Sequence, residues 1–148
     1  MEAMQTDLAR LKAGQVGAQF WSVFVDFRLP EPQAVDGFTL GMHAVRAAHE
    51  GLAQPYPAKP IRIVMPFSTG GTDLVTRWLA LKLAPALGQQ IVPEPRTGAG
   101  GNIGHELVAK AAPDGYTLLM AAPPFVVNPT LYGKVPYDPF RDFSPIML

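Results

Sequence analysis

The sequence contains no cysteine, carries no net charge and has no apolar run of membrane-spanning length. Without cysteine the chain forms neither disulfides nor thiolate metal sites, and cysteine usage does not indicate whether the protein works in an oxidising or a reducing compartment. Twelve basic residues balance twelve acidic ones, so no nucleic-acid partner is expected. Sixteen prolines and fourteen glycines separate apolar runs, and 148 residues are enough for a sizeable core.

One stretch near the middle of the chain predicts a strand, a glycine turn and the start of a helix. Apolar β-branched residues at 61, 63 and 64 end at Pro66, as is typical of a buried strand. The pair Gly70–Gly71 follows, and Thr72 or Asp73 is predicted to cap the helix through a side-chain oxygen. Glycine allows close backbone approach and a helix start offers free N–H donors, so an anion site is one interpretation. A tight turn that only requires glycine is the other.

Residues 1–55 follow a different pattern and are predicted to form a separate, atypical segment. Within it, residues 6–12 are typical of a short helix and residues 16–25 of a buried strand. Polar residues interrupt the apolar run and no cleavage signal follows it, so no signal peptide is predicted. Residues 42–52 are expected to form a further helix, and a boundary is placed at residues 54–57.

The run Gly-Ala-Gln-Phe-Trp-Ser-Val lies within residues 6–25 and is unusual. Through this run, residues 6–25 resemble a segment of the membrane (renal-type) dipeptidases, zinc enzymes with a TIM-barrel fold. That family's His-x-Asp motif is absent, and His43, His49 and His105 have no partners at ligand spacing. Neither a metal site nor dipeptidase chemistry is therefore predicted.

From residue 56 onward, strand and helix patterns alternate. The first strand is followed by a helical apolar spacing that ends at Gly88, a predicted C-cap. A second strand starts at Ile91 and is expected to be cut short by Pro93 and Pro95. The first helix is expected to bury Leu74, Val75, Trp78, Leu79 and Leu83 and to point Arg77 and Lys82 away.

The glycine loop, defined as residues 98–104, is expected to open a second helix that ends at Ala112, with a third strand at residues 116–121. This order predicts an α/β fold with a parallel βαβαβ sheet over residues 60–122, the first strand lying between the other two or beside them. In such folds ligands bind at the carboxyl ends of the strands.

The glycine loop does not match a nucleotide-binding motif. Counting from Gly98, the third glycine of G-x-G-x-x-G would fall on Ile103, and no Gly-Lys-Ser/Thr sequence is present. Close packing of a helix against a strand is the preferred interpretation, and no cofactor is predicted.

Consistently spaced motifs extend from Tyr56 to Leu148. They are residues 56–67, Gly70–Gly71 with Asp73 and Arg77, residues 98–104, 113–119, 128–132, 136–139 and 141–145. In these motifs the segment 56–148 resembles the N-terminal part of the Bug family, the extracytoplasmic solute receptors of tripartite tricarboxylate transport systems.

The resemblance implies a partial first lobe of a periplasmic binding protein-like fold, which binds a small carboxylate in the periplasm and works with membrane transporter subunits. In the family, ligand carboxylates are held largely by backbone N–H groups and waters from loops after the first and third strands. Carried over to this sequence, the first loop comprises Phe67, Ser68, Thr69, Gly70, Gly71, Thr72 and Asp73. The second loop comprises Ala121, Ala122 and Pro123 and continues to Phe125.

No catalytic residue is predicted in either loop. The hydroxyls of Ser68, Thr69 and Thr72 have no base adjacent in sequence, and Asp73 is explained as a helix cap. His105 is the one base that the fold could bring to them.

The first loop is one residue shorter than the usual family pattern, and the chain stops at Leu148, where family members continue into a second lobe. Since a closing second lobe adds donors and excludes water, we expect this chain to bind dicarboxylates with millimolar affinity or undetectably. Two alternatives stay open: a fragment of a zinc dipeptidase, based only on residues 6–25, and a fusion or mispredicted frame without independent function.

Overall fold

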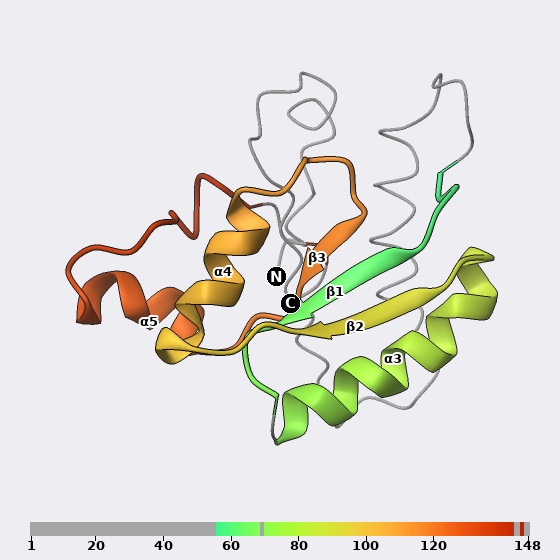
Figure 1. Ribbon diagram of the computed structural model, residues 1–148, viewed down its shortest axis with the longest axis horizontal. Coiled ribbons are helices and arrows are strands. Elements are labelled where there is room, and N and C mark those ends of the chain that lie inside the picture. Colours follow the sequence, from blue (N-terminus) through green and yellow to red (C-terminus); the bar gives the residue numbers. More distant parts are fainter. Residues whose placement is uncertain (1–55, 69, 144–145, 147–148) are drawn as a thin grey trace, which may run out of the picture.

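The computed structural model describes residues 56–68, 70–143 and 146 (Figure 1). Its elements are β1 (Ile61–Met65), α3 (Gly71–Leu87), β2 (Ile91–Pro95), the 3-10 helix η1 (Ala99–Gly101), α4 (Asn102–Ala109), β3 (Thr117–Leu119) and α5 (Pro124–Leu131). The elements predicted within residues 1–55 lie outside the described residues, and the division of the chain near residue 55 stays a prediction.

The three strands form a parallel sheet in the order β2-β1-β3, which confirms the predicted βαβαβ unit. Ile61 is paired with Ile91, and Ile63 with Leu118. The third strand, β3, is shorter than the predicted range of residues 116–121. Its pairing with β1 continues one residue beyond Leu119, because Met120 N donates to the carbonyl of Val64 over 2.9 Å. The first strand is therefore central, as one of the two predicted arrangements required.

The prolines of β2 do not cut the strand short, so that prediction is wrong. Arg96 N donates to Met65 O over 2.8 Å. Because N–H groups alternate in direction along a strand, Pro93 and Pro95 occupy positions whose nitrogens face away from β1. At the edge of the described sheet no bond is lost there, and β2 continues to Pro95.

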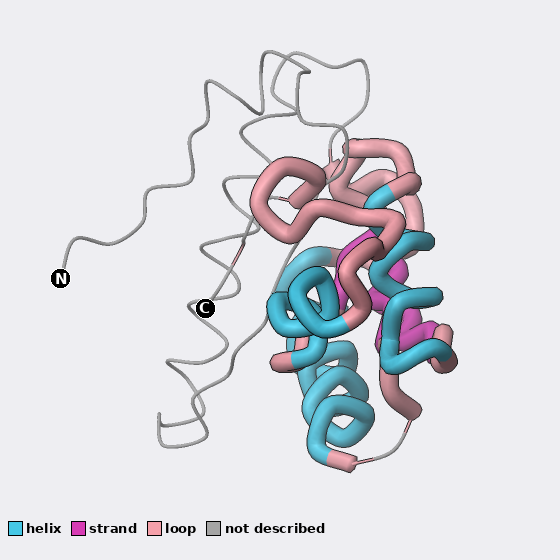
Figure 2. The backbone as a smooth tube through the Cα atoms, turned by 90° about the vertical axis from the view of Figure 1, so that its left-hand side faces the viewer, coloured by secondary structure: helices cyan, strands magenta, loops and turns pink. Residues whose placement is uncertain are grey.

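The described strands lie between helices (Figure 2), and alternate residues of the strands supply two separate cores, one on each face of the sheet. The core on the α3 face contains Ile61, Ile63, Met65, Leu118 and Met120 with Val75, Leu79 and Leu83 of the helix. The core on the α4 face contains Val64, Leu119 and Ala121 with Val108, Phe125, Tyr137 and Phe143. Helices therefore cover both faces, as a doubly wound sheet requires.

The boundaries and the buried stripe of the helices differ in part from the predictions. Leu74 is 73% exposed, because the stripe of α3 runs through residues 75, 76, 79, 80 and 83. Thr76 is buried in place of Leu74, and its hydroxyl donates to the carbonyl of Thr72 over 2.6 Å. Gly88 has φ 67° and is the C-cap, as predicted. The second helix ends at Ala109 rather than Ala112.

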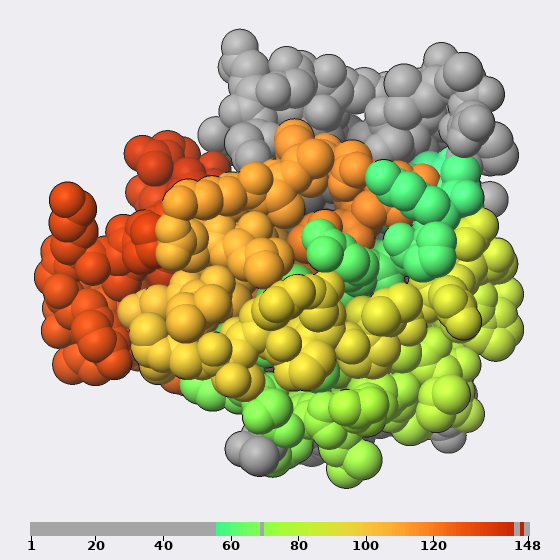
Figure 3. Space-filling model, viewed as in Figure 1, coloured from blue at the N-terminus to red at the C-terminus, as the bar shows by residue number. Residues whose placement is uncertain are grey.

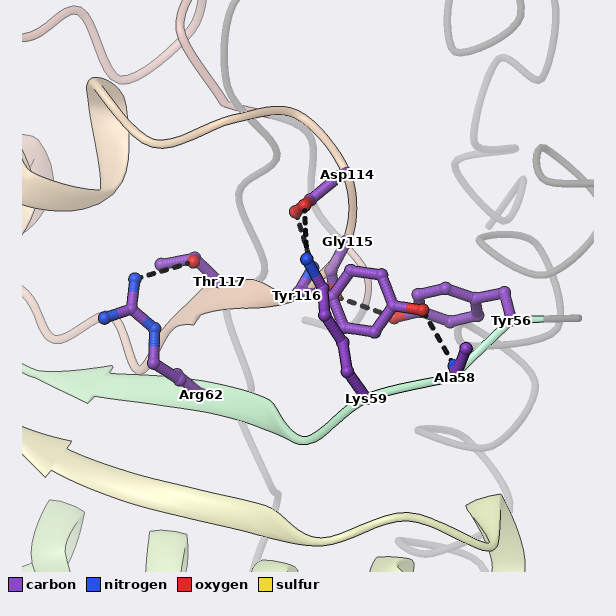
Figure 4. Close-up of polar contacts among 8 residues, drawn as sticks. All are labelled: Tyr56, Ala58, Lys59, Arg62, Asp114, Gly115, Tyr116 and Thr117. Atoms are coloured by element: carbon purple, nitrogen blue, oxygen red, sulfur yellow. Dashed lines mark hydrogen bonds and ion pairs between the residues drawn. The ribbon is translucent and has the colours of Figure 1, made fainter. Parts of the chain in front are cut away.

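Two tyrosines fasten the amino ends of β1 and β3 together (Figure 4). The Tyr56 hydroxyl donates to Gly115 O over 2.7 Å, and the Tyr116 hydroxyl accepts a bond of 2.8 Å from Ala58 N. Their ring centroids are 4.9 Å apart, and the Lys59 ammonium lies 4.3 Å from the centroid of the Tyr116 ring. These contacts fix the relative positions of the two strands whose opposite ends carry the candidate ligand loops.

Candidate functional site

The carboxyl ends of all three strands lie at one edge of the sheet, here called the carboxyl edge, and α5 lies beside it (Figure 1). The chain leaves β1 toward α3 on one face and leaves β2 toward α4 on the other. With the strand order β2-β1-β3, the direction of winding reverses between β1 and β3. This switch point is where open α/β sheets bind ligands, and the first and second loops flank it.

The first loop ends in the first turn of α3, whose start has no side-chain cap among the described residues. The N-cap of α3 is Gly70, with φ 92° and ψ −161°, and no side chain bonds the free N–H groups. The prediction that Thr72 or Asp73 caps the helix is wrong, since both lie within its first turn. The Asp73 carboxylate instead accepts from Arg77 Nε over 3.0 Å. The N–H groups of residues 71–73 consequently have no side-chain cap, and Thr69 lies outside the described residues.

The glycine pair of the first loop is open to its surroundings. Among the residues that the structure describes, a Cβ added to Gly70 or Gly71 would meet no heavy atom within 4 Å. Phe67 is half-buried and Ser68 is exposed. Only Gly70 needs glycine for its backbone conformation, which side chains rarely adopt. The room at Gly71 is therefore not required by packing within the chain.

The second loop is short and offers few donors. Ala121 is buried, Ala122 is half-buried and Pro123 is exposed. Phe125 N donates to Ala122 O over 2.8 Å as α5 begins. Because prolines occupy positions 123 and 124 and have no N–H, the donors of this loop outside the helix belong to the two alanines.

The glycine loop packs α4 closely against the end of β1, which agrees with the packing interpretation. A Cβ on Gly104 would lie 2.8 Å from Arg96 O and 3.1 Å from Pro66 Cα. A Cβ on Gly101, whose φ is 92°, would lie 2.9 Å from Phe67 Cζ. The glycine loop and α4 therefore pack against Pro66 and Phe67, where the first loop begins. They form one continuous surface in the space-filling view (Figure 3).

Asn128 holds the glycine loop from α5, a role that the sequence analysis missed. Its side chain is buried, and its Nδ2 donates to Gly100 O over 2.9 Å and to Asn102 Oδ1 over 2.7 Å. An amide within the otherwise apolar stretch of α5 is the signal that could have identified it.

His105, the candidate base, lies inside the core on the α4 face and is fully buried. Neither ring nitrogen has a hydrogen-bond partner among the described residues. Burial lowers the pKa of His105 to about 4, so the ring is neutral at pH 7. Its neighbours are the rings of Phe125 and Tyr137, at centroid distances of 5.2 and 5.0 Å. With no exposed surface, the imidazole cannot receive a proton from a substrate in solution.

Within the described part of the chain, no three His, Cys, Asp or Glu side chains are grouped so that they could hold a metal ion. Among the same residues, no helix is both long and apolar enough to cross a membrane. The only charged side chain in the first and second loops is that of Asp73, and Arg77 pairs with it. Any ligand charge at these loops would therefore be met mainly by backbone dipoles.

A family model described as "Tripartite tricarboxylate transporter family receptor" matches residues 75–148. The protein BugT of Bordetella pertussis is 40% identical over 117 residues, which are 74% of this chain and 36% of BugT. A protein encoded in the tcbD-tcbE intergenic region of Pseudomonas sp. is 44% identical over 94 residues, which are 63% of this chain and 28% of that protein. The chain thus spans about a third of the length of these relatives.

Two solved structures resemble the described fold. The periplasmic binding protein BugD is 45% identical with a TM-score of 0.55, and the match covers 57% of this chain and 29% of BugD. A protein from Rhodopseudomonas palustris, solved with adipate, is 37% identical with a TM-score of 0.54 over the same shares. These comparisons do not support the dipeptidase-like interpretation of residues 6–25, which also lie outside the described residues.

Proposed function

The chain belongs to the tripartite tricarboxylate transporter receptor family, and we propose that it is part of a periplasmic receptor whose first and second loops bind a small carboxylate. Proteins of this family are solute-binding receptors and not enzymes. The ligand, the periplasmic location, the absence of catalysis and the membrane transporter subunits as partners are all parts of this proposal.

The observation that carries the proposal is the uncapped start of α3 beside an open glycine pair. Within the described residues, the N–H groups of residues 71–73 have no side-chain cap, and no atom lies within 4 Å of a Cβ placed on Gly70 or Gly71. A helix N-terminus attracts an anion through its free donors and its partial positive charge. A carboxylate oxygen fits this arrangement, because it accepts from several N–H groups at once.

The position of the second loop supports the same ligand class. It follows β3, directly across the switch point from the first loop, and Ala122 is half-buried with only a small side chain beside its backbone. The adipate of the R. palustris neighbour is a flexible dicarboxylate. We propose that one carboxylate of such a ligand lies at the first loop and that the rest of the ligand passes the second loop.

Isothermal titration calorimetry with adipate and the full chain tests the proposal. Adipate should bind with an affinity no tighter than millimolar, whereas 1,6-hexanediol, which has the same chain length without carboxylates, should not bind at the same concentrations. Gly71→Val should abolish binding, because a β-branched side chain would enter the space that the carboxylate needs, and a Cβ at this position meets no heavy atom of the described residues within 4 Å. Ala86→Val is the matched control, since it adds a β-branched residue at an exposed position near the far end of α3.

Equal binding of the diol and adipate would contradict a carboxylate site. Unchanged adipate binding by Gly71→Val would contradict the position at the start of α3.

A further inference from the structure

The His105 side chain lies where the supports of both loops meet. Its ring makes edge contacts with Phe125, the last residue of the second loop, at a centroid distance of 5.2 Å. A Cβ placed on Gly101 would lie 3.1 Å from His105 Cε1 and 2.9 Å from Phe67 Cζ. The imidazole therefore borders the same small space as Phe67 of the first loop, and it touches the end of the second loop directly.

The imidazole is an unusual choice for this position. It is fully buried, and neither nitrogen has a hydrogen-bond partner in the part of the chain that the structure describes. A buried polar group without a partner destabilises the fold, whereas an apolar side chain of similar shape would fill the site without that cost. Packing alone consequently does not explain a histidine here.

We propose that His105 is a positioning residue of the carboxylate site, whose neutral ring holds Phe67 and Phe125, and with them the two loops, in place. Adding a proton would put an unpaired charge into an apolar core, which is so costly that the core would have to open. Both loops would then shift, and ligand affinity would fall. Since the loops bind ligand only if the proposed function holds, this inference rests on that function.

None of the described groups around the ring compensates the charge of an added proton. The segment after α5 presents Tyr137, whose hydroxyl donates to a backbone carbonyl and whose pKa burial raises to about 12, so it stays neutral. The end of β1 contributes apolar side chains, and α5 has no ionisable residue. On α4 itself, Glu106 is paired with Lys110. Burial is the cause of the lowered pKa of His105, with no contribution from a described charge.

The test compares three variants of the full chain by amide hydrogen exchange and by adipate titration. His105→Ala removes the ring, and His105→Phe keeps an aromatic ring that cannot take up a proton. Leu83→Ala is the control, because it empties a fully buried site in the other core, near the far end of α3. When the variants are compared at the same global stability, His105→Ala should increase the amide exchange rates of residues 67–73 and 121–125 at least tenfold more than Leu83→Ala does. His105→Phe should exchange at wild-type rates in both loops.

Adipate affinity should fall about tenfold in His105→Ala and stay within threefold of wild type in His105→Phe and Leu83→Ala. Between pH 7 and 4 the wild-type affinity should fall more steeply than that of His105→Phe. Protonation of adipate itself affects both proteins equally, so the difference between them belongs to His105.

Equal loop exchange in His105→Ala and Leu83→Ala, or equal pH profiles of wild type and His105→Phe, would overturn the inference. Equal binding of adipate and 1,6-hexanediol by the wild type would refute the proposed function, and the exchange rates of the two loops would still decide the positioning role.

Discussion

Acid should destabilise this fold through His105. The unfolded chain takes up a proton at this residue near its ordinary pKa of 6.5, whereas burial lowers the folded value to about 4. Between these two pH values the unfolded state binds more protons, so the free energy of unfolding decreases as the pH falls. The contribution of His105 to the free energy of unfolding is thus fully present above pH 6.5 and is lost as the pH falls to about 4.

The size of the effect follows from the two pKa values. Each pKa unit corresponds to about 1.4 kcal/mol, so a difference of about 2.5 units gives a loss of about 3 kcal/mol between pH 7 and pH 4. That is a large part of the stability of a typical small domain. Urea unfolding of the full chain, followed by circular dichroism at several pH values, measures it.

His105→Phe provides the reference, because carboxylates and the other histidines titrate equally in both proteins. The curves of unfolding free energy against pH should diverge below pH 6.5, with wild type losing about 3 kcal/mol more by pH 4. At pH 7 the variant should be as stable as wild type or more so, since it removes an unpartnered polar ring. Parallel curves would refute a buried, neutral His105.

Three further predictions concern the backbone around the site and are measured by urea unfolding at pH 7. Gly70→Ala should lower the free energy of unfolding by about 1–3 kcal/mol, because a residue with a side chain is strained at φ 92° and ψ −161°. Gly71→Ala should leave the free energy of unfolding unchanged or raise it by up to about 1 kcal/mol, because Gly71 lies in a helix and its Cβ would meet no described atom. Equal losses of unfolding free energy in Gly70→Ala and Gly71→Ala would contradict the backbone conformation of Gly70. Gly104→Ala should cost about 1–3 kcal/mol, since its Cβ would lie 2.8 Å from a backbone oxygen, and a smaller loss would speak against the close packing of α4. Asn128→Ala should cost about 1–3 kcal/mol through two lost hydrogen bonds, and an unchanged midpoint would contradict them.

The sheet could be predicted from the sequence because its signals are local. The strand around Ile63 is a short apolar run ended by proline, and Gly88 marks a helix end by its own backbone freedom. The order of strands and helices then restricts the topology to a few right-handed arrangements.

The errors arose where geometry depends on neighbours far away in the chain. Pro93 and Pro95 are compatible with β2 because the strand lies at the edge of the described sheet, with their nitrogens directed outward. Leu74 shares helical spacing with the buried stripe but lies just outside it, so Thr76 takes its place against the core.

The candidate site was located from the sequence, but its support was not. The order of the motifs placed both loops at the ends of neighbouring strands, whereas the roles of His105 and Asn128 depend on contacts between α4 and α5. Helix-face periodicity indicates which residues can be buried, but it does not indicate which rings will surround them.

Mapping backbone amide shifts by NMR during an adipate titration of the full chain tests the central claim most directly. We expect the shifts to be concentrated at residues 70–73 and at Ala121 and Ala122, with little change at the opposite edge around Ala58 and Gly115. Shifts centred on that opposite edge would contradict a carboxylate site at the first and second loops.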